Sequence, residues 1–464
     1  DGINPTREAP PMMGEHTVKL LKELQYDDGD VEVLCNNKIA ISTTNFLKEK
    51  LPGKSNASNR FKWVEYLQEG NTFGDTTKTI PKKNASSIDK FNDGPLTGVK
   101  VLDLTTHLSG PYCSMILADH GADVVKVENP NGGDPLRHSP PFQEGESAPF
   151  MLWNRNKRSV ALDLKSKDDL RILQQMARKA DVMIENFKPG TARRLGIDYK
   201  AITQINPDVI YCSISGFGQT GPYADRGGFD LIANAMSGLM SINGPADGPP
   251  FRIPVPVSDV CAGMHAAIGI LLALNNRQHT GSGQYIDTSL FEAGISLGVY
   301  EAASVFANGE VPERLGQAHR GSAPYQMFKT ADGYITVGGA KENFWVSLCK
   351  VLGCEHFLDD PKYESKEERV KNHVHLAKDL TTFFENYSTE EIWKLLDEAG
   401  IPAGPVLNHV DVFKNPQTIA RGMVDSVRHS KVGDMKTLGS PLKMSKTPAK
   451  ILKGAPLLGE HNKE

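Results

Sequence analysis

The chain has 464 residues, of which 39% are hydrophobic and 23% charged, the composition of an ordinary globular protein with room for two or three domains. Its formal net charge of −4 gives no electrostatic reason to expect a nucleic-acid partner. The six cysteines are scattered without a Cys-x-x-Cys pair, so we expect no disulfide framework, no metal site and a reducing compartment, the cytoplasm.

The first 94 residues differ from the rest in composition and in hydrophobic periodicity. Residues 1–50 contain one amphipathic pattern, Thr17 to Leu24, which predicts a helix and is followed by an acidic turn. Residues 51–94 are polar, rich in Ser, Asn, Lys and Gly, and without a hydrophobic period. This second stretch predicts a linker.

A short internal repeat connects the two ends of the chain. Pro-Met-Met-Gly-Glu-His at 11–16 echoes Pro-Leu-Leu-Gly-Glu-His at 456–461. The repeat predicts that residues 1–50 are the tail of a preceding unit, and that this chain is the second half of a tandem protein. Coincidence is the alternative for a match of this length.

From about Thr97, β-branched runs alternate with helical patterns. Helices are expected at 113–121 and 169–180, and strands at 99–105, 122–128, 159–164, 181–187 and 208–216. Runs that are apolar on both faces and alternate with helices indicate βαβ units around a buried parallel sheet. We therefore predict an α/β fold with a Rossmann-like large domain over 95–325. No Gly-x-Gly-x-x-Gly follows the first strand, which argues against a dinucleotide site.

The second half begins with a helical stretch, 231–274, that is interrupted at 241–256. Its apolar part, 262–274, contains His265 and is too short to span a bilayer, so we expect a buried helix and no membrane partner. Residues 281–290 predict a turn followed by a strand. Two further segments follow. The first is a smaller α+β domain over 326–425, which contains a Pro-rich turn at 401–406, and the second is a C-terminal return segment over 426–464 made of loops and short extended pieces.

Read in order, several segments resemble the CaiB/BaiF, or family III, CoA-transferases. These segments are residues 97–137, 154–165, 181–197, 206–240, 280–290 and 401–408, together with the ending at 456–461. The resemblance implies a Rossmann-like large domain with a smaller domain, interlocked with a second unit that is an identical chain or a tandem half. It also implies an enzyme that moves CoA from an acyl-CoA to a small carboxylic acid, with the CoA thioester as co-substrate.

Asp230 directly precedes a helical pattern, so its plain interpretation is a helix N-cap. The resemblance instead matches it with the family's nucleophilic aspartate, which attacks the thioester and forms an acyl–aspartyl anhydride and CoA thiolate. Both roles are compatible, because a helix N-terminus favours the carboxylate form. Asp259 opens the next apolar helix with the same ambiguity and is the second choice of carboxylate.

The 3′-phosphate and pyrophosphate of CoA require cations, for which arginines are candidates, although an Arg-rich turn is often simply solvated. Some positions match CoA-contacting residues of the family, and Phe187 among them can pack beside adenine or belong to the core. The predicted CoA-binding residues are His107, Asn129, Arg137, Asn186, Phe187 and Arg194.

Two other activities compete with CoA transfer. The α-methylacyl-CoA racemases of the same fold family have a His directly before the matching aspartate, whereas this chain has Phe229, which argues against racemisation. A catalytically silent half that only supports its twin would be expected to lose Asp230, which is present.

The acceptor acid is left open between two interpretations. The tandem repeat favours an acetyl-CoA-dependent dimethylsulfoniopropionate CoA-transferase/lyase, in which β-elimination releases dimethyl sulfide. The alternative is a dicarboxylate CoA-transferase of the succinate/glutarate–hydroxymethylglutarate type.

Overall fold

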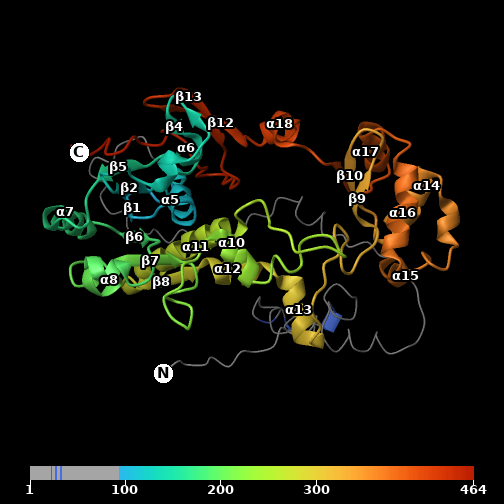
Figure 1. Cartoon of the computed structure of the whole chain (residues 1–464), viewed down its shortest axis with the longest axis horizontal. Helices are drawn as coiled ribbons and strands as arrows, with labels where there is room; N and C mark the ends of the chain where they lie inside the picture. The colour runs from blue at the N-terminus through green and yellow to red at the C-terminus, as the bar shows by residue number, and fades with distance from the viewer. Residues whose placement is uncertain (1–21, 23–26, 29–31, 34–93) are drawn as a thin grey trace. The chain divides into compact units, whose positions relative to one another are not determined.

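The computed structural model describes residues 22, 27–28, 32–33 and 94–464 (Figure 1). The chain divides into two compact units, Asp1–Asn84 and Ala85–Glu464. The repeat at 11–16, most of the helix predicted over 17–24 and the linker predicted over 51–94, except Gly94, lie outside the described residues.

The centre of the second unit is a parallel sheet in the order β5-β2-β1-β6-β7-β8. Its strands are β1 Lys100–Asp103, β2 Asp123–Glu128, β5 Arg158–Ala161, β6 Val182–Glu185, β7 Ile210–Ser215 and β8 Tyr285–Ser289. The chain passes from β1 outward to β5 and then returns to β6 on the other side of β1, which is the Rossmann order with its switch point between β1 and β6. The predicted α/β class with a Rossmann-like parallel sheet is confirmed.

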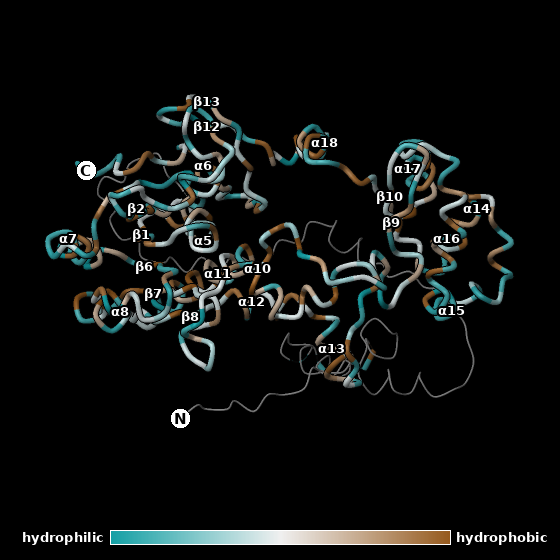
Figure 2. The backbone as a smooth tube through the Cα atoms, viewed as in Figure 1, coloured by the Kyte–Doolittle hydropathy of each residue, from teal (hydrophilic) through white to brown (hydrophobic). Residues whose placement is uncertain are grey.

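The sheet is covered on both faces because successive side chains of its strands point to opposite sides. Val101 of β1 belongs to a cluster with helices α5 (Ser109–Asp119) and α11 (Val257–Thr280). Its neighbour Leu102 belongs to a second cluster with α7 (Lys167–Ala177). Hydrophobic and hydrophilic segments alternate along α7 in Figure 2, as expected for a helix with one buried face.

The remaining helices of this part of the chain are short. They are η1 Pro135–His138, α6 Ala148–Trp153, α8 Thr191–Leu195, α9 Tyr199–Thr203, α10 Asp230–Met236, α12 Leu290–Leu297 and α13 Val299–Asn308. Helix α11 is long and apolar enough to cross a membrane by length and composition alone. One face of α11 packs against α5, α12, β7 and β8. Other apolar side chains of the helix, among them Ile268 and Leu272, are exposed, so the expectation of a buried helix holds only for one face.

A second sheet, antiparallel and in the order β11-β10-β9, is formed by β9 Tyr325–Lys329, β10 Tyr334–Gly338 and β11 Ala403–Pro405. Its core includes Phe328, Ile335 and Trp345. The helices of this region are α14 Glu342–Leu352, η2 Glu355–Leu358, α15 Lys366–Lys371, α16 His373–Phe384, α17 Thr389–Glu398, α18 His409–Lys414 and α19 Pro416–Ala420. The prediction of a Pro-rich turn over 401–406 was wrong in part, because strand β11 lies inside this range. Its proline is tolerated because β11 is the edge strand of the sheet.

The C-terminal residues include a regular hairpin, β12 Val424–His429 with β13 Gly433–Leu438, where only loops and short extended pieces were predicted. The hairpin was missed because its apolar residues are few and lie three positions apart, Val424 and Val427 in β12 and Met435 and Leu438 in β13, so they lack the two-residue period of a strand. Val427 and Met435 pack with Phe150 and Met151 of α6.

The ending Pro-Leu-Leu-Gly-Glu-His lies along β5, the edge strand of the parallel sheet. The His461 N–H donates to the Ser159 carbonyl at 3.0 Å, and the Ser159 N–H donates to His461 Nδ1 at 3.2 Å. Gly459, whose φ of +66° lies in the left-handed region, donates its N–H to Ser159 Oγ at 3.1 Å. These contacts cover an edge that would otherwise expose unpaired backbone groups.

Candidate active site

The loops that follow β1, β2 and β6 carry four of the predicted CoA-binding residues. His107 follows β1, Asn129 follows β2, and Asn186 and Phe187 follow β6. Because the carboxyl ends of parallel strands meet at one edge of the sheet, the fold places these four residues at the same edge, around the switch point where ligands of open α/β sheets bind. Phe187 is partly buried against the α7 side of the sheet, so at least part of its ring belongs to the core.

Asn186 bridges the two loops at the switch point. The Thr106 N–H donates to Asn186 Oδ1 at 2.9 Å, and Asn186 Nδ2 donates to the Thr106 carbonyl at 2.8 Å. The amide group therefore holds the loop on which His107 lies. A positioning role for Asn186 was not visible in the sequence, because its partner is 80 residues away. Its predicted contact with CoA stays a prediction.

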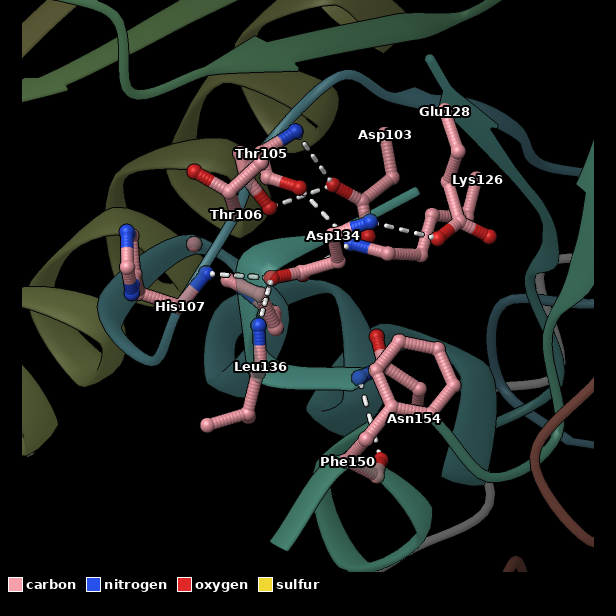
Figure 3. Close-up of polar contacts among 12 residues, drawn as sticks. Asp103, Thr105, Thr106, His107, Lys126, Glu128, Asp134, Leu136, Phe150 and Asn154 are labelled. Atoms are coloured by element: carbon pink, nitrogen blue, oxygen red, sulfur yellow. Dashed lines mark hydrogen bonds and ion pairs between the residues drawn. The ribbon is translucent and has the colours of Figure 1, made fainter. Parts of the chain in front are cut away.

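The backbone of His107 is held in the left-handed region, with φ of +64°, which is uncommon for a residue other than glycine. Its N–H donates to Oδ1 of the buried Asp134 at 3.1 Å (Figure 3). The other oxygen of Asp134 pairs with Lys126 Nζ at 2.9 Å, and Lys126 donates to the Thr105 carbonyl at 2.7 Å. A buried ion pair thus fixes the loop and leaves the imidazole of His107 exposed at the sheet edge.

Asp103, at the end of β1, completes this buried network. Its carboxylate accepts hydrogen bonds from the Thr105 N–H at 2.9 Å, from Ser114 Oγ at 2.6 Å and from Lys157 Nζ at 3.0 Å. Burial alone would raise the pKa of Asp103, but the charges of Lys157 and Lys126 hold it well below its usual range. Burial also lowers the pKa of Lys157 to about 8, although Asp103 opposes that shift. The network is a fully paired structural element.

The predicted arginines occupy different environments. Arg137 binds both oxygens of Glu128, at 2.8 and 2.7 Å, and its guanidinium lies 3.8 Å from the ring centroid of Phe150. Arg194 is exposed and donates to Thr191 Oγ1 at 3.0 Å. The charge of Arg137 is therefore already paired within the protein, while that of Arg194 is open to solvent. The predicted roles of both residues in CoA binding stay predictions, as does that of the exposed Asn129.

Asp230 caps a helix, but not the one that was predicted. It is the first residue of α10, whose N-cap position is occupied by Phe229, so the expectation that it caps its own helix was wrong. Its Oδ1 accepts the N–H groups of Ser258 at 2.9 Å and Asp259 at 3.3 Å, in the first turn of α11. The N-cap residue of α11, Pro256, has no side-chain acceptor, and Asp230 supplies one from the neighbouring helix.

The second oxygen of Asp230 accepts a hydrogen bond from Asn234 Nδ2 at 2.7 Å, one turn later in α10. Ser258 Oγ donates in turn to Asn234 Oδ1 at 3.1 Å. Asn234 and Ser258 are fully buried, so they hold the carboxyl group in a fixed orientation. Sequence reasoning missed both residues; the spacing of four between Asp230 and Asn234 was the available signal.

Two neighbouring carboxyl groups in this region have raised pKa values. Burial raises the pKa of Asp230, although the N–H groups of Asp259 and Ser258 and the charge of Arg252 act in the opposite direction. Burial and the negative charge of Asp230 raise the pKa of Asp259 to about 7, against a lowering hydrogen bond from Ser109. The expectation that Asp259 is itself a cap was also wrong, because it lies inside the first turn of α11.

Phe229 connects this carboxyl pair to the loop after β1. Its side chain is 69% exposed, and its ring lies edge-on to that of His107 with 6.3 Å between centroids. Asp230 is therefore next to the same sheet edge as the predicted CoA-binding residues. The arrangement combines a buried, hydrogen-bonded carboxylate, a helix N-terminus and an open edge of a parallel sheet, which suits covalent chemistry on a carboxyl group.

A cavity of about 700 Å³ lies elsewhere, on the smaller sheet. Its lining comes from residues 317–319 and from strands β9, β10 and β11, and includes His319, Tyr325 and Gly338. None of the predicted site residues lines it. Neither Asp230 nor Asp259 lines this cavity, so the carboxyl pair and the cavity are separate features of the described chain.

Comparison with known proteins decides the family. The family model for CoA-transferase family III matches residues 96–462. The chain belongs to this family. The resemblance to CaiB/BaiF proteins inferred from the sequence is confirmed, and the protein is a CoA-transferase, an enzyme whose co-substrates are CoA thioesters.

Three relatives illustrate the similarity. Human succinyl-CoA:glutarate CoA-transferase is 39% identical over 374 residues, which cover 80% of this chain and 85% of the relative. Succinyl-CoA:mesaconate CoA-transferase of Haloarcula hispanica is 38% identical over 381 residues, covering 80% of this chain and 95% of the relative. The crystal structure of a CaiB/BaiF family protein from Brucella suis has a TM-score of 0.73 and 36% identity, and covers 80% of this chain and 98% of that one.

Proposed function

We propose that this CoA-transferase moves CoA from an acyl-CoA donor to a dicarboxylic acid, with Asp230 as the carboxylate that carries CoA between them. The observation that carries the proposal is the environment of Asp230, a buried carboxyl group held by backbone N–H groups at the start of α11. The choice of a dicarboxylic acid is supported by relatives whose names specify succinyl-CoA with glutarate or mesaconate. It replaces dimethylsulfoniopropionate as the preferred acceptor, because none of the relatives described above is named for that substrate or for a lyase.

The reaction proceeds through exchanges at the Asp230 carboxyl group. The carboxylate attacks the donor thioester, which forms a mixed anhydride and releases CoA thiolate. The thiolate attacks the Asp230 carbonyl, expels the donor acid and leaves an aspartyl thioester. The acceptor carboxylate attacks this thioester, and the released thiolate then attacks the acceptor carbonyl of the second anhydride, which restores the Asp230 carboxylate. No net proton is taken up or released.

The start of α11 contributes directly to these steps. When thiolate attacks the carboxyl carbon of Asp230, negative charge develops on the oxygen that the N–H groups of Ser258 and Asp259 contact at 2.9 and 3.3 Å. These donors are in place before the reaction, so they act as an oxyanion hole for the tetrahedral intermediate. The loss of one such donor in other enzymes costs about 10²–10³ in rate.

The variant Asp230→Asn tests the nucleophile, because an amide keeps the shape of the side chain but cannot form the anhydride. We expect a loss of at least about 10³-fold in transfer from succinyl-CoA to glutarate, with an unchanged circular dichroism spectrum. The matched control is Asp198→Asn, which alters an N-cap carboxylate of α9 that can be replaced by another good cap. Turnover by Asp230→Asn within tenfold of the control would contradict the assignment.

An acceptor panel tests the substrate class. Succinyl-CoA and acetyl-CoA are each offered with glutarate, mesaconate, a monocarboxylic acid and dimethylsulfoniopropionate, and the CoA products are separated by chromatography. We expect transfer to the dicarboxylic acids with a higher kcat/KM than to the others. Release of dimethyl sulfide into the headspace, with no transfer to dicarboxylic acids, would instead support the transferase/lyase alternative.

We also propose that the enzyme works with a second, interlocked unit, either an identical chain or a tandem half. The support is an apolar surface on α11, α12 and α13, where Leu272 is 65% and Phe306 86% exposed. Light scattering coupled to size-exclusion chromatography measures the assembly. We expect a mass above that of one chain, and a shift toward one chain for Leu272→Glu/Phe306→Glu. A wild-type mass of one chain would contradict pairing with an identical chain and leave a tandem half as the second unit.

A further inference from the structure

Asp259 lies where three elements meet. It is in the first turn of α11, its N–H donates to Asp230 of α10, and its carboxyl group is hydrogen-bonded to Ser109, the first residue of α5. Ser109 follows the loop of His107, which the sequence matches with CoA binding. Asp259 is therefore tied both to the carboxyl group that reacts and to the loop expected to hold CoA.

The charges around Asp259 are unbalanced. Among the described residues, the charged group that acts on it is Asp230, a like charge from α10. The positive charge of Arg252 acts on Asp230. His107, from the loop before α5, has an exposed ring that faces Phe229. Within the described residues no ion pair is formed by either carboxyl group of the pair, in contrast to Asp103 and Asp134.

Two adjacent carboxyl groups cannot both ionise cheaply when no cation acts on one of them, here Asp259. Since Oδ1 of Asp230 has the two N–H donors at the start of α11, the ionised form is better stabilised there. The pKa of Asp259 is raised to about 7, so below neutral pH it holds the proton of the pair. The reaction needs the proton on Asp259 rather than on Asp230, because Asp230 must attack as a carboxylate.

We propose that Asp259 is a positioning residue: it permits transfer of CoA while its carboxyl group is uncharged and suppresses transfer when that group ionises. The exchange steps at Asp230 do not themselves require it. Ionised, it places a second negative charge beside Asp230, which repels the CoA thiolate, the developing oxyanion and the acceptor carboxylate. Uncharged, it leaves one negative charge at the start of α11. This inference rests on the proposed role of Asp230.

The test is the pH dependence of kcat/KM for transfer from succinyl-CoA to glutarate between pH 6 and 9, where both acids are ionised. For the wild-type enzyme we expect kcat/KM to fall above about pH 7, by up to roughly tenfold per pH unit. The variant Asp259→Asn cannot ionise, and its ratio of kcat/KM at pH 8.5 to that at pH 6.5 should be close to one. A wild-type profile without the fall, or an Asp259→Asn profile that retains it, would overturn the proposal.

A second variant separates titration from a structural effect. The hydrogen bond from Ser109 lowers the pKa of Asp259, so Ser109→Ala should raise that pKa further and move the fall in kcat/KM to higher pH. A purely structural role of Asp259 predicts no such shift, and an unmoved profile would contradict the inference. Asp230→Asn, which we expect to be inactive at every pH, reports on the proposed function separately. If it were active, the assignment of the nucleophile would fail rather than that of Asp259.

Discussion

Two groups of buried carboxylates lie near the same sheet edge and differ in how their charge is balanced. Asp103 and Asp134 are paired with Lys157 and Lys126, and each carboxylate also accepts hydrogen bonds from the loop after β1. Asp230 and the half-buried Asp259 have hydrogen-bond donors but, within the described part of the chain, no ion pair, and both have raised pKa values. The first group stabilises a loop, whereas the second keeps a carboxyl group reactive. Unbalanced charge at a defined position is what marks the reactive pair.

Removal of a cation from the paired group should produce the largest loss of stability. Lys157→Met leaves the buried Asp103 without its ion-pair partner, and we expect a decrease of about 3–5 kcal/mol in the free energy of unfolding. Urea denaturation measures this change. Lys165→Met, on an exposed part of the chain between β5 and α7, is the matched control and should change stability by less than about 0.5 kcal/mol. Equal effects for the two variants would show that the ion pair is not structural.

Release of the loop after β1 should lower stability less, but it should specifically weaken the binding of CoA. Asn186→Ala removes two hydrogen bonds to the Thr106 backbone, and we expect a loss of about 2 kcal/mol. Because the loop carries His107, the KM for succinyl-CoA should rise more than kcat falls. A variant with lowered stability but unchanged KM would show that the loop does not contribute to CoA binding.

The contributions of the two groups to the free energy of unfolding should also change with pH in opposite directions. Asp103 has a depressed pKa, so its contribution to stability is present above the unfolded pKa near 4 and is lost as the pH falls below it. Asp259 has a raised pKa, so its contribution is present below about pH 4 and is lost as the pH rises toward about 7. Relative to the wild type, the free energy of unfolding of Asp259→Asn should therefore gain roughly 3 kcal/mol between pH 4 and pH 7. A constant difference across this range would contradict the raised pKa.

The sequence predicted the strands of the parallel sheet well, because runs such as Val99 to Thr105 are apolar on both faces and follow helical patterns. It did not predict what Asp230 contacts, since the capped residues Ser258 and Asp259 lie 28 and 29 positions away and belong to another helix. The pairing of Arg137 with Glu128 was hidden for a similar reason: a strand end and a 3₁₀ helix bring them together. Local patterns identify elements, whereas the partners of charged groups depend on tertiary packing.

The central claim is that Asp230 becomes covalently linked to CoA, and trapping measures this most directly. The enzyme is incubated with succinyl-CoA and hydroxylamine, digested, and analysed by mass spectrometry for the residue converted into a hydroxamate. We predict modification of Asp230, dependent on succinyl-CoA and absent in Asp230→Asn. Modification of Asp259 instead, or turnover to glutaryl-CoA without any modified carboxyl group, would contradict the account.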